Sequence, residues 1–450
     1  MPTWLQKHNW VQTIILFVLA ILSLLLIFST TYTASNPQEG QGAVLRQIVF
    51  FVLGFSIYFA LSSGDISWIK QKTTVSLLYV VILVALIGVL VFAPEINGTK
   101  RWILIGPLSF QPAEYAKLVL ILLTSYIFTQ NIDELGGLEQ KWQENLWLKL
   151  LISTVLTSIF VMLIFLQPSL GNAILTGMIW LVLIFMVFPM NSDFMLGMFA
   201  SFTGFLSYYS LIIFDNLRNI SLLSDNEWKL FVVASFALLS AVLYKFFDFK
   251  LIPLLFVFFS LLVTGPLIDF GYQNILQPYH RERIDTYIEG FGADPRDSGY
   301  QVRQSLTAIG AGQLFGRGYL QGTQSSLQTL PFAHTDFIFA AHAEQFGLMG
   351  VIILFILYGL LFLNLIQTML KLSDIFAKLV VTGVIALLAV NIFINIAMNM
   401  GLVPVTGVPL PLVSYGGSAV IVNLSALGLV QMAGNALKSK DVTEKFTWGP

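Results

Sequence analysis

The sequence predicts an all-α integral membrane protein, a polytopic bundle of about twelve membrane-spanning helices. Of its 450 residues, 56% are hydrophobic and only 10% are charged, and the mean hydropathy is +0.81. Soluble globular proteins carry about 25% charged residues, so this chain has too few polar side chains to cover a water-facing surface. Its apolar residues also form continuous runs rather than the short alternating strands of a membrane β-barrel.

The individual spans follow from the length of these runs, because a helix needs roughly 20 mostly apolar residues to cross the hydrocarbon. The candidate spans are residues 11–29, 46–63, 75–93, 112–129, 149–166, 172–189, 194–214, 229–246, 251–268, 346–368, 377–396 and 412–434. The first run precedes Thr33-Ala34-Ser35 and so resembles a signal peptide. It is longer than a signal-peptide core and more spans follow, which favours a retained helix.

Charge and cysteine content exclude several classes of function. The net charge of −1 removes nucleic acid as a bulk electrostatic partner. The absence of cysteine excludes disulfides, thiolate metal sites and thiol catalysis.

Basic residues predict the orientation of the chain, since cytoplasmic loops are enriched in them. Placing both termini in the cytoplasm puts Lys70, Lys72, Lys371 and Lys378 inside, and it puts all eight arginines outside. Arginine suits phosphate and carboxylate groups. The outer arginines therefore either pair with lipid headgroups or bind an anionic ligand.

The long outer loop, residues 271–335, is too apolar for disorder and is expected to fold onto the outer membrane face. No fixed-period repeat or low-complexity tract divides the chain. Residues 1–450 are therefore expected to form one membrane domain with short tails.

The loop that precedes the fourth span contains the first candidate site residues. Pro112 is placed to start the helix, and Glu114 and Lys117 share one face of its first turns. Charges inside a membrane helix normally face a cavity or a partner. This pair either neutralises itself or serves a substrate. Trp102 in the same loop is either a site residue or a member of the interfacial aromatic belt.

The second candidate region lies in the long outer loop. Asp294 precedes Pro295, so it either caps a turn or is a carboxylate with a pKa raised toward that of a general base. The neighbouring glutamines, which include Gln301 and Gln304, either bind sugar hydroxyl and N-acetyl groups or are ordinary loop residues.

Two further stretches on the outer side break the usual rules for membrane helices. His334, Asp336 and Glu344 place three ionisable groups at one end of a span. Residues 400–418 contain three prolines and four glycines, and non-helical backbone at that depth must line a cavity or be buried in protein. No metal-ligand spacing and no glycine-rich nucleotide loop is present.

Five segments resemble the SEDS family, named for shape, elongation, division and sporulation. They are RWILIGPLSFQPAEYAKL (101–118), QPSLGNA (167–173), ADPRDSGYQVRQSLTAIGAGQLFGRGYLQGTQ (293–324), HTDFIFAAHAEQFG (334–347) and VPVTGVPLPLVSYGGS (403–418). The stretch after Gly316 is more similar to the elongation type than to the division type. The family has ten spans, so residues 229–268 are expected to form an added helical hairpin. The family's second acidic positions are Ser169 and Gln345 here.

The resemblance implies a peptidoglycan glycosyltransferase that polymerises lipid II at the outer face of the cytoplasmic membrane, with inversion and β-1,4 linkage. It implies a class B penicillin-binding transpeptidase and other elongation-complex membrane proteins as partners. Its essential aspartate corresponds to Asp294. The substrate-binding residues that we expect are Arg101, Trp102, Gln111, Glu114, Lys117, Arg283, Tyr300, Gln301, Arg303, Gln304, His334, Asp336, Glu344 and Ser414.

Other functions stay open at this point. No cofactor is certain, and a divalent cation, Mg²⁺ or Mn²⁺, is an alternative that the sequence leaves undecided. A flippase for the lipid-linked precursor would place polar residues near the midplane on repeated halves, and neither feature is visible. A non-enzymatic scaffold would explain the spans but not the arginines and glutamines of the loop. Division or sporulation roles within the family also remain alternatives.

Overall fold

The computed structural model describes residues 8–32, 37–95, 100–105, 108–130, 146–188, 276, 278–289, 298–326 and 329–446. The chain divides into two compact units, unit 1 with residues 1–184 and 300–450 and unit 2 with residues 185–299. The predicted spans 194–214, 229–246 and 251–268 lie outside the described residues, as does Asp294.

The helices of unit 1 confirm the predicted membrane fold. They are α2 (Trp10–Thr31), α3 (Pro37–Ser62), α4 (Ile66–Ile69), α5 (Lys72–Phe92), α6 (Pro112–Thr129), α8 (Leu146–Leu166), α9 (Leu170–Val187), α14 (Ser298–Gly312), α15 (Thr323–Ser326), α16 (Ile338–Lys371), α17 (Ile375–Asn399) and α18 (Gly417–Phe446). Among the described residues, eight helices are long and apolar enough to cross a membrane. The predicted span 112–129 also forms a helix, α6. It is not among the eight because its two charged residues, Glu114 and Lys117, lower its mean hydropathy.

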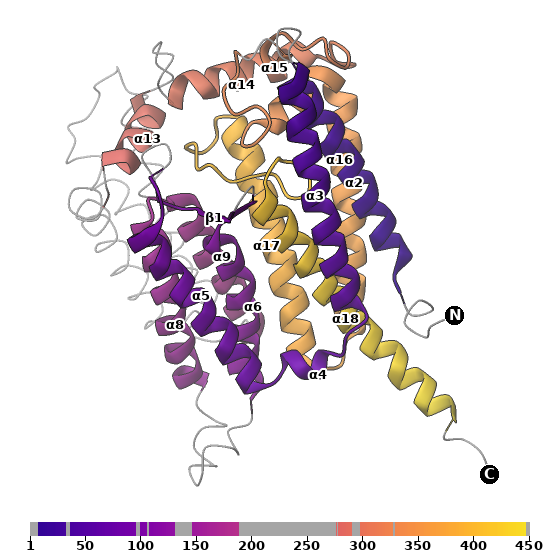
Figure 1. Ribbon diagram of the computed structural model, residues 1–450. Helices are drawn as coiled ribbons and strands as arrows, with labels where there is room; N and C mark the ends of the chain where they lie inside the picture. Colours follow the sequence, from indigo (N-terminus) through magenta and orange to yellow (C-terminus); the bar gives the residue numbers. More distant parts are fainter. Residues whose placement is uncertain are drawn as a thin grey trace, which may run out of the picture. The chain divides into compact units, whose positions relative to one another are not determined.

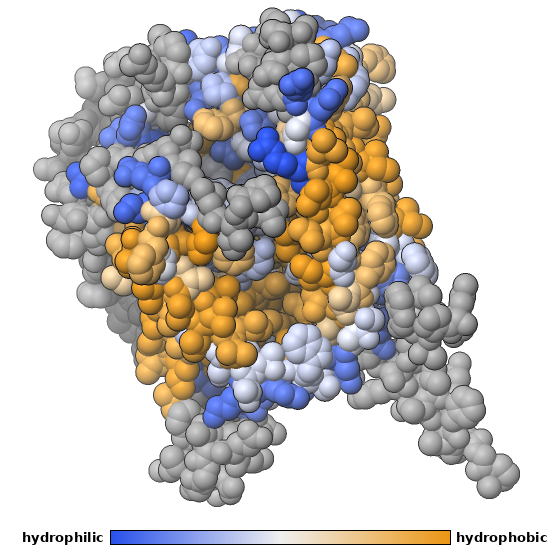
Figure 2. All heavy atoms as spheres, in the orientation of Figure 1, coloured by the Kyte–Doolittle hydropathy of each residue, from blue (hydrophilic) through white to orange (hydrophobic). Residues whose placement is uncertain are grey.

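Unit 1 is a helical bundle with apolar side chains around its middle (Figure 2). Helix α18 packs along α3, and α6 contacts α5, α8, α17 and α18. Glycine permits the closest approaches: a side-chain carbon at Gly54 would meet Leu424, and one at Gly428 would meet the backbone of Tyr58. Within a bilayer the hydrophobic effect does not drive helices together, so they associate by close van der Waals packing, which small residues permit.

Two ends of unit 1 can be distinguished (Figure 1). Helix α4, the start of α2 and the end of α18 lie at one end. There Lys70 pairs with Asp374, the N-cap residue of α17, at 3.2 Å. The opposite end holds α14, α15 and a small hairpin of β1 (Ile103–Ile105) and β2 (Leu108–Phe110). Both described chain ends therefore lie on one side of the bundle.

Three details differ from the sequence-based expectation. The hairpin, with Ile103 opposite Phe110, was not predicted in an otherwise helical chain. Helix α16 begins at Ile338 rather than 346, and it contains a break at Gly347, where φ is 65°. Helix α18 begins at Gly417 rather than 412, because the backbone before it is not helical. Leu412 there has a φ of 64°.

Unit 2 is described over short segments that include α13 (Pro278–Glu289). The Nε of Arg281 in this helix donates to the carbonyl of Leu276 at 3.0 Å. Within residues 271–335, the stretch that the sequence predicts to be a long outer loop, the chain forms α13, α14 and α15.

Candidate functional site

A buried ion pair lies at the hairpin end of unit 1. Helix α6 starts at Pro112, and its first two turns carry Glu114 and Lys117. The Lys117 ammonium lies 2.8 Å from the Glu114 carboxylate, and the Lys117 side chain is 0% exposed. Lys117 also donates to the amide oxygen of Asn172 at 3.2 Å. Such a pair is retained only where its charges and hydrogen bonds are matched.

The start of α6 is fixed by the hairpin and by α18. The backbone N–H of Gln111, the N-cap residue of α6, donates to the hydroxyl of Ser418 at 2.9 Å. That hydroxyl donates to the carbonyl of Ser109 in β2 at 3.1 Å. Ser418 thus joins the last long helix to the loop that leads into the charged turn.

Of the proline- and glycine-rich stretch 400–418, the part from Leu410 to Ser414 is buried, whereas Met400 and Leu402 near its start are exposed. Gly171 at the start of α9 lies against this segment, because a side-chain carbon there would meet the carbonyl of Thr406 at 2.6 Å. Asn172 follows directly in the chain, so this contact places the segment beside the Lys117 partner. Gly407, which follows Thr406 in this segment, faces the Asp336 carboxylate. A side-chain carbon at Gly407 would lie 3.6 Å from Oδ2 of Asp336.

The segment that holds His334 and Asp336 is fixed by its backbone. The Ser414 hydroxyl donates to the Thr335 carbonyl at 2.6 Å, and the Tyr415 N–H donates to the His334 carbonyl at 2.9 Å. The His334 ring meets the Tyr415 ring edge to face at 5.7 Å. Ser414 therefore fixes the backbone at Thr335, and the side chains on either side of Thr335, His334 and Asp336, are half-buried.

Three buried amide side chains, which the sequence analysis did not single out, complete the framework. Asn395 and Asn399 of α17 donate to the Asp336 carbonyl at 2.9 and 3.0 Å. Gln47 of α3 donates to the Ser414 carbonyl at 3.3 Å. Their signal in the sequence was present, because amides inside apolar helices are costly unless they bond within the protein.

The remaining predicted residues are placed as follows. Arg101 donates through Nε to the Gln167 carbonyl at 3.2 Å, next to the α8–α9 turn that leads to Asn172, and Trp102 is half-buried beside it. Tyr300, Gln301 and Gln304 lie half-buried on α14, while Arg303 on that helix is exposed. Helix α14 is held to α17 by the Ser305 hydroxyl, which donates to the Asn399 carbonyl at 2.8 Å. Arg283 lies on α13 in unit 2.

Glu344 has a different environment from the other acidic residues. It is fully buried on α16, and its Oε1 accepts from the Thr323 hydroxyl at 3.1 Å and from the Gln324 N–H at 2.8 Å. Its own carbonyl accepts from the Arg317 N–H at 2.9 Å. Glu344 therefore binds the 317–324 loop to α16. The Tyr319 phenol in this loop donates to the Leu25 carbonyl at 3.0 Å, and burial raises its pKa, which keeps it a donor.

We expect Glu344→Leu to release this loop, because the Gln324 N–H and the Thr323 hydroxyl would lose their acceptor. The cost is about 1–3 kcal/mol for a buried donor left unpaired. Hydrogen–deuterium exchange over residues 317–326 should rise. Glu344→Gln keeps an acceptor oxygen and should leave exchange nearly unchanged. If Glu344→Gln removes activity while the loop stays protected, the carboxylate has a direct role with substrate.

Among the described residues, no group of three or more His, Asp or Glu side chains is placed to hold a metal ion. Glu114 and Lys117 are paired with each other, and Asn395, Asn399 and Gln47 donate to backbone carbonyls. The arrangement is an interior polar framework under one membrane face, with half-buried side chains presented above it.

Comparison with known proteins identifies the class. The profile of the FtsW/RodA/SpoVE family of cell cycle proteins matches residues 9–230 and 225–439. This chain therefore belongs to that family, which confirms the resemblance drawn from the sequence.

Individual relatives extend over nearly the whole chain. Peptidoglycan glycosyltransferase MrdB of Escherichia coli K12 is 30% identical, over 92% of this chain and 91% of its own. Peptidoglycan glycosyltransferase RodA of Treponema pallidum is 29% identical, over 93% and 95%. A solved chain from a peptidoglycan synthase complex has a TM-score of 0.63 at 26% identity, covering 96% of this chain and 98% of that one. The rod shape determining protein RodA of Thermus thermophilus shares the fold, with a TM-score of 0.55 at 22% identity over 95% and 96%.

Proposed function

We propose that this protein is a peptidoglycan glycosyltransferase of the inner membrane, which polymerises lipid II into glycan strands during cell elongation. The observation that carries the proposal is the buried Glu114–Lys117–Asn172 cluster. Gly171, next to Asn172, packs against Thr406, and the adjacent Gly407 faces Asp336. The relatives of this chain are named peptidoglycan glycosyltransferases.

In the proposed reaction, the sugar 4-hydroxyl of an incoming lipid II attacks the anomeric carbon of the growing glycan. The bond from that carbon to the polyprenyl pyrophosphate breaks, and the pyrophosphate departs with the bonding electrons. Asp294 takes the hydroxyl proton as general base. Direct displacement inverts the anomeric centre and yields a β-1,4 link. Arg101, Arg283 and Arg303 stabilise the charge of the leaving pyrophosphate.

The other residues of the expected set divide into two roles under this proposal. Glu114, Lys117 and Ser414 keep the framework in place beneath the substrate. The backbone N–H of Gln111 joins it to Ser418, and Glu344 holds the 317–324 loop. The half-buried side chains of Trp102, Tyr300, Gln301, Gln304, His334 and Asp336 contact the sugars and the pyrophosphate. A class B penicillin-binding transpeptidase crosslinks the product, and other elongation-complex membrane proteins associate with the pair.

The decisive experiment incubates the purified full-length protein and its transpeptidase partner with labelled lipid II in detergent. We expect glycan polymer that a muramidase digests. In detergent a flippase has no leaflets to exchange between, so a flippase or scaffold would yield no polymer. Reactions with added Mg²⁺, with added Mn²⁺ and with a chelator decide whether a divalent cation takes part.

The proposal places the site outside and both termini in the cytoplasm, which single cysteines can test in this cysteine-free chain. Gln321 and Ser67 are both exposed and lie at opposite ends of unit 1, in the α14–α15 region and in α4. With the outer barrier opened, a membrane-impermeant maleimide should label Gln321→Cys in intact cells. It should label Ser67→Cys only after lysis. The reverse pattern would invert the proposed orientation.

A further inference from the structure

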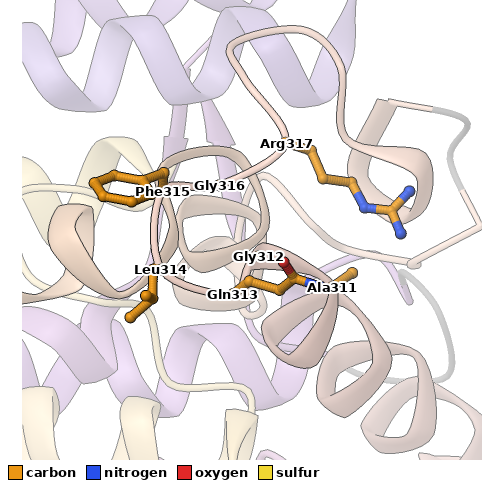
Figure 3. A pocket seen from close by; sticks show the side chains of 7 residues that line it. All are labelled: Ala311, Gly312, Gln313, Leu314, Phe315, Gly316 and Arg317. Carbon is orange, nitrogen blue, oxygen red and sulfur yellow. The ribbon is translucent and has the colours of Figure 1, made fainter.

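Two large apolar side chains are exposed in the loop between α14 and α15. Leu314 is 58% exposed and Phe315 is 77% exposed. They lie in the segment 311–317, which lines a pocket of about 400 Å³. Figure 3 shows both side chains on the side of the loop opposite to the guanidinium of Arg317. That guanidinium donates to the Thr323 hydroxyl at 3.2 Å, so the loop has an apolar side and a polar side.

The apolar side of this loop is attached rigidly to α16. Gly347 breaks that helix with a φ of 65°, and the next two N–H groups are redirected to the loop. The Leu348 N–H donates to the Gln313 carbonyl at 2.9 Å, and the Met349 N–H donates to the Leu314 carbonyl at 3.1 Å. The carbonyls of Gln313 and Leu314 thus accept the hydrogen bonds that carbonyls of the preceding turn would accept in an unbroken helix. The position of Leu314 and Phe315 along α16 is therefore fixed by backbone bonds.

Below this junction, α16 exposes one continuous apolar face. It comprises Leu348, Met349, Ile352, Ile353, Phe355, Ile356, Leu360, Leu363, Ile366 and Leu370, which are between 38% and 67% exposed. At 1.5 Å per residue the helix from Leu348 to Leu370 spans about 34 Å, against about 30 Å for the hydrocarbon. Lys371 ends the helix at the other membrane face.

These lengths set the depth of the loop. If the exposed face of α16 fills the hydrocarbon from Leu370 upward, Leu348 lies at its opposite boundary. The carbonyls of Gln313 and Leu314 are bonded to the N–H groups of Leu348 and Met349, so Leu314 and the adjacent Phe315 then lie at the level of the headgroups and the first acyl carbons. Aromatic and large apolar side chains are favoured at that level.

We propose that Leu314 and Phe315 form a lipid anchor, which inserts into the interface of the bilayer leaflet next to α14 and α15. The occupant is the lipid surface itself, because the Leu314 carbonyl is bonded to Met349, where the exposed apolar face of α16 begins. The anchor fixes the loop to the lipid at Leu314 and Phe315, and Glu344 fixes the same connection to α16 at Thr323 and Gln324. It keeps the α14–α15 connection at a fixed height above the membrane.

The test uses single cysteines carrying a nitroxide spin label in the full chain, reconstituted into phosphatidylethanolamine–phosphatidylglycerol nanodiscs. Labels at Phe315→Cys and Leu314→Cys are compared with a label at Gln321→Cys, an exposed polar position in the same connection. The ratio of collisions with oxygen to collisions with a water-soluble nickel complex should be roughly tenfold higher at 314 and 315, since oxygen concentrates in acyl chains while the complex stays in water.

Two results would overturn the proposal. Equal ratios at 315 and 321 would mean that the side chain faces water. Low collision rates with both reagents at 314 and 315 would mean that protein, from a second copy of the chain, covers the patch. The two apolar positions serve as independent probes, and neither reading depends on polymerase activity.

Discussion

Replacing Asp294 by asparagine is expected to abolish lipid II polymerisation while leaving the protein folded in the membrane. A turn cap needs only a short side-chain acceptor, which asparagine supplies nearly as well. A general base needs a group that takes up a proton, and asparagine cannot do so. The rate should fall by at least about 10²-fold, the usual contribution of general-base catalysis. The measurement is glycan polymer formed per minute by purified protein at matched concentration.

Asp297 provides a matched control for this experiment. It shares the loop and the charge with Asp294 but does not align with the family's essential acid. Asp297→Asn should therefore retain most of the activity. Near-normal polymerisation by Asp294→Asn would show that the carboxylate is structural and that the proton is accepted by another group.

Replacing Lys117 by methionine is expected to cause the largest loss of stability among the site variants. The change leaves the Glu114 carboxylate buried beside an uncharged side chain and removes the donor to Asn172. Removing one partner of a buried ion pair costs about 3–5 kcal/mol. The midpoint of thermal unfolding in detergent should fall sharply, and the membrane level of the protein should fall with it.

The double variant Glu114→Gln with Lys117→Met separates stability from function. It removes both charges, so its unfolding midpoint should recover toward that of the wild type. If the pair also serves the substrate, the double variant should remain inactive at normal expression. Full activity in the double variant would mean that the two charges only neutralise each other.

Much of the bundle could be predicted because membrane solvation acts on continuous runs of residues. Pro112 starts α6 at the predicted position, since proline suits the first helical turn and an apolar run follows it. The start of α16 was placed eight residues too late. His342, Glu344 and Gln345 lower the hydropathy of that turn, yet all three are buried within the protein. Hydropathy reports how well a side chain tolerates lipid, and it therefore fails for these three, which contact protein instead.

The candidate site was predicted as a set of residues but not as a framework. The Glu114–Lys117 contact followed from helical spacing. The bond from Lys117 to Asn172 and the bonds from Asn395 and Asn399 to the Asp336 carbonyl instead join residues distant in sequence. The role of Glu344 also depends on such contacts, because its partners Thr323 and Gln324 lie across a loop. The hairpin at 103–110 did have a local signal, two short β-forming runs around Gly106-Pro107.

The hydrogen bonds that join α2 and α3 to residues 414–427 constrain the order of assembly. Gln12 of α2 donates to the Leu427 carbonyl at 3.1 Å, and Gln47 of α3 donates to the Ser414 carbonyl at 3.3 Å. These acceptors belong to α18 and the segment before it, which are synthesised after α2 and α3. Before that, Gln12 lacks this native acceptor, and the Gln47 amide can donate only to the Ser23 hydroxyl of α2, at 3.4 Å. The bonds to Leu427 and Ser414 form only after α18 and the segment before it have been synthesised.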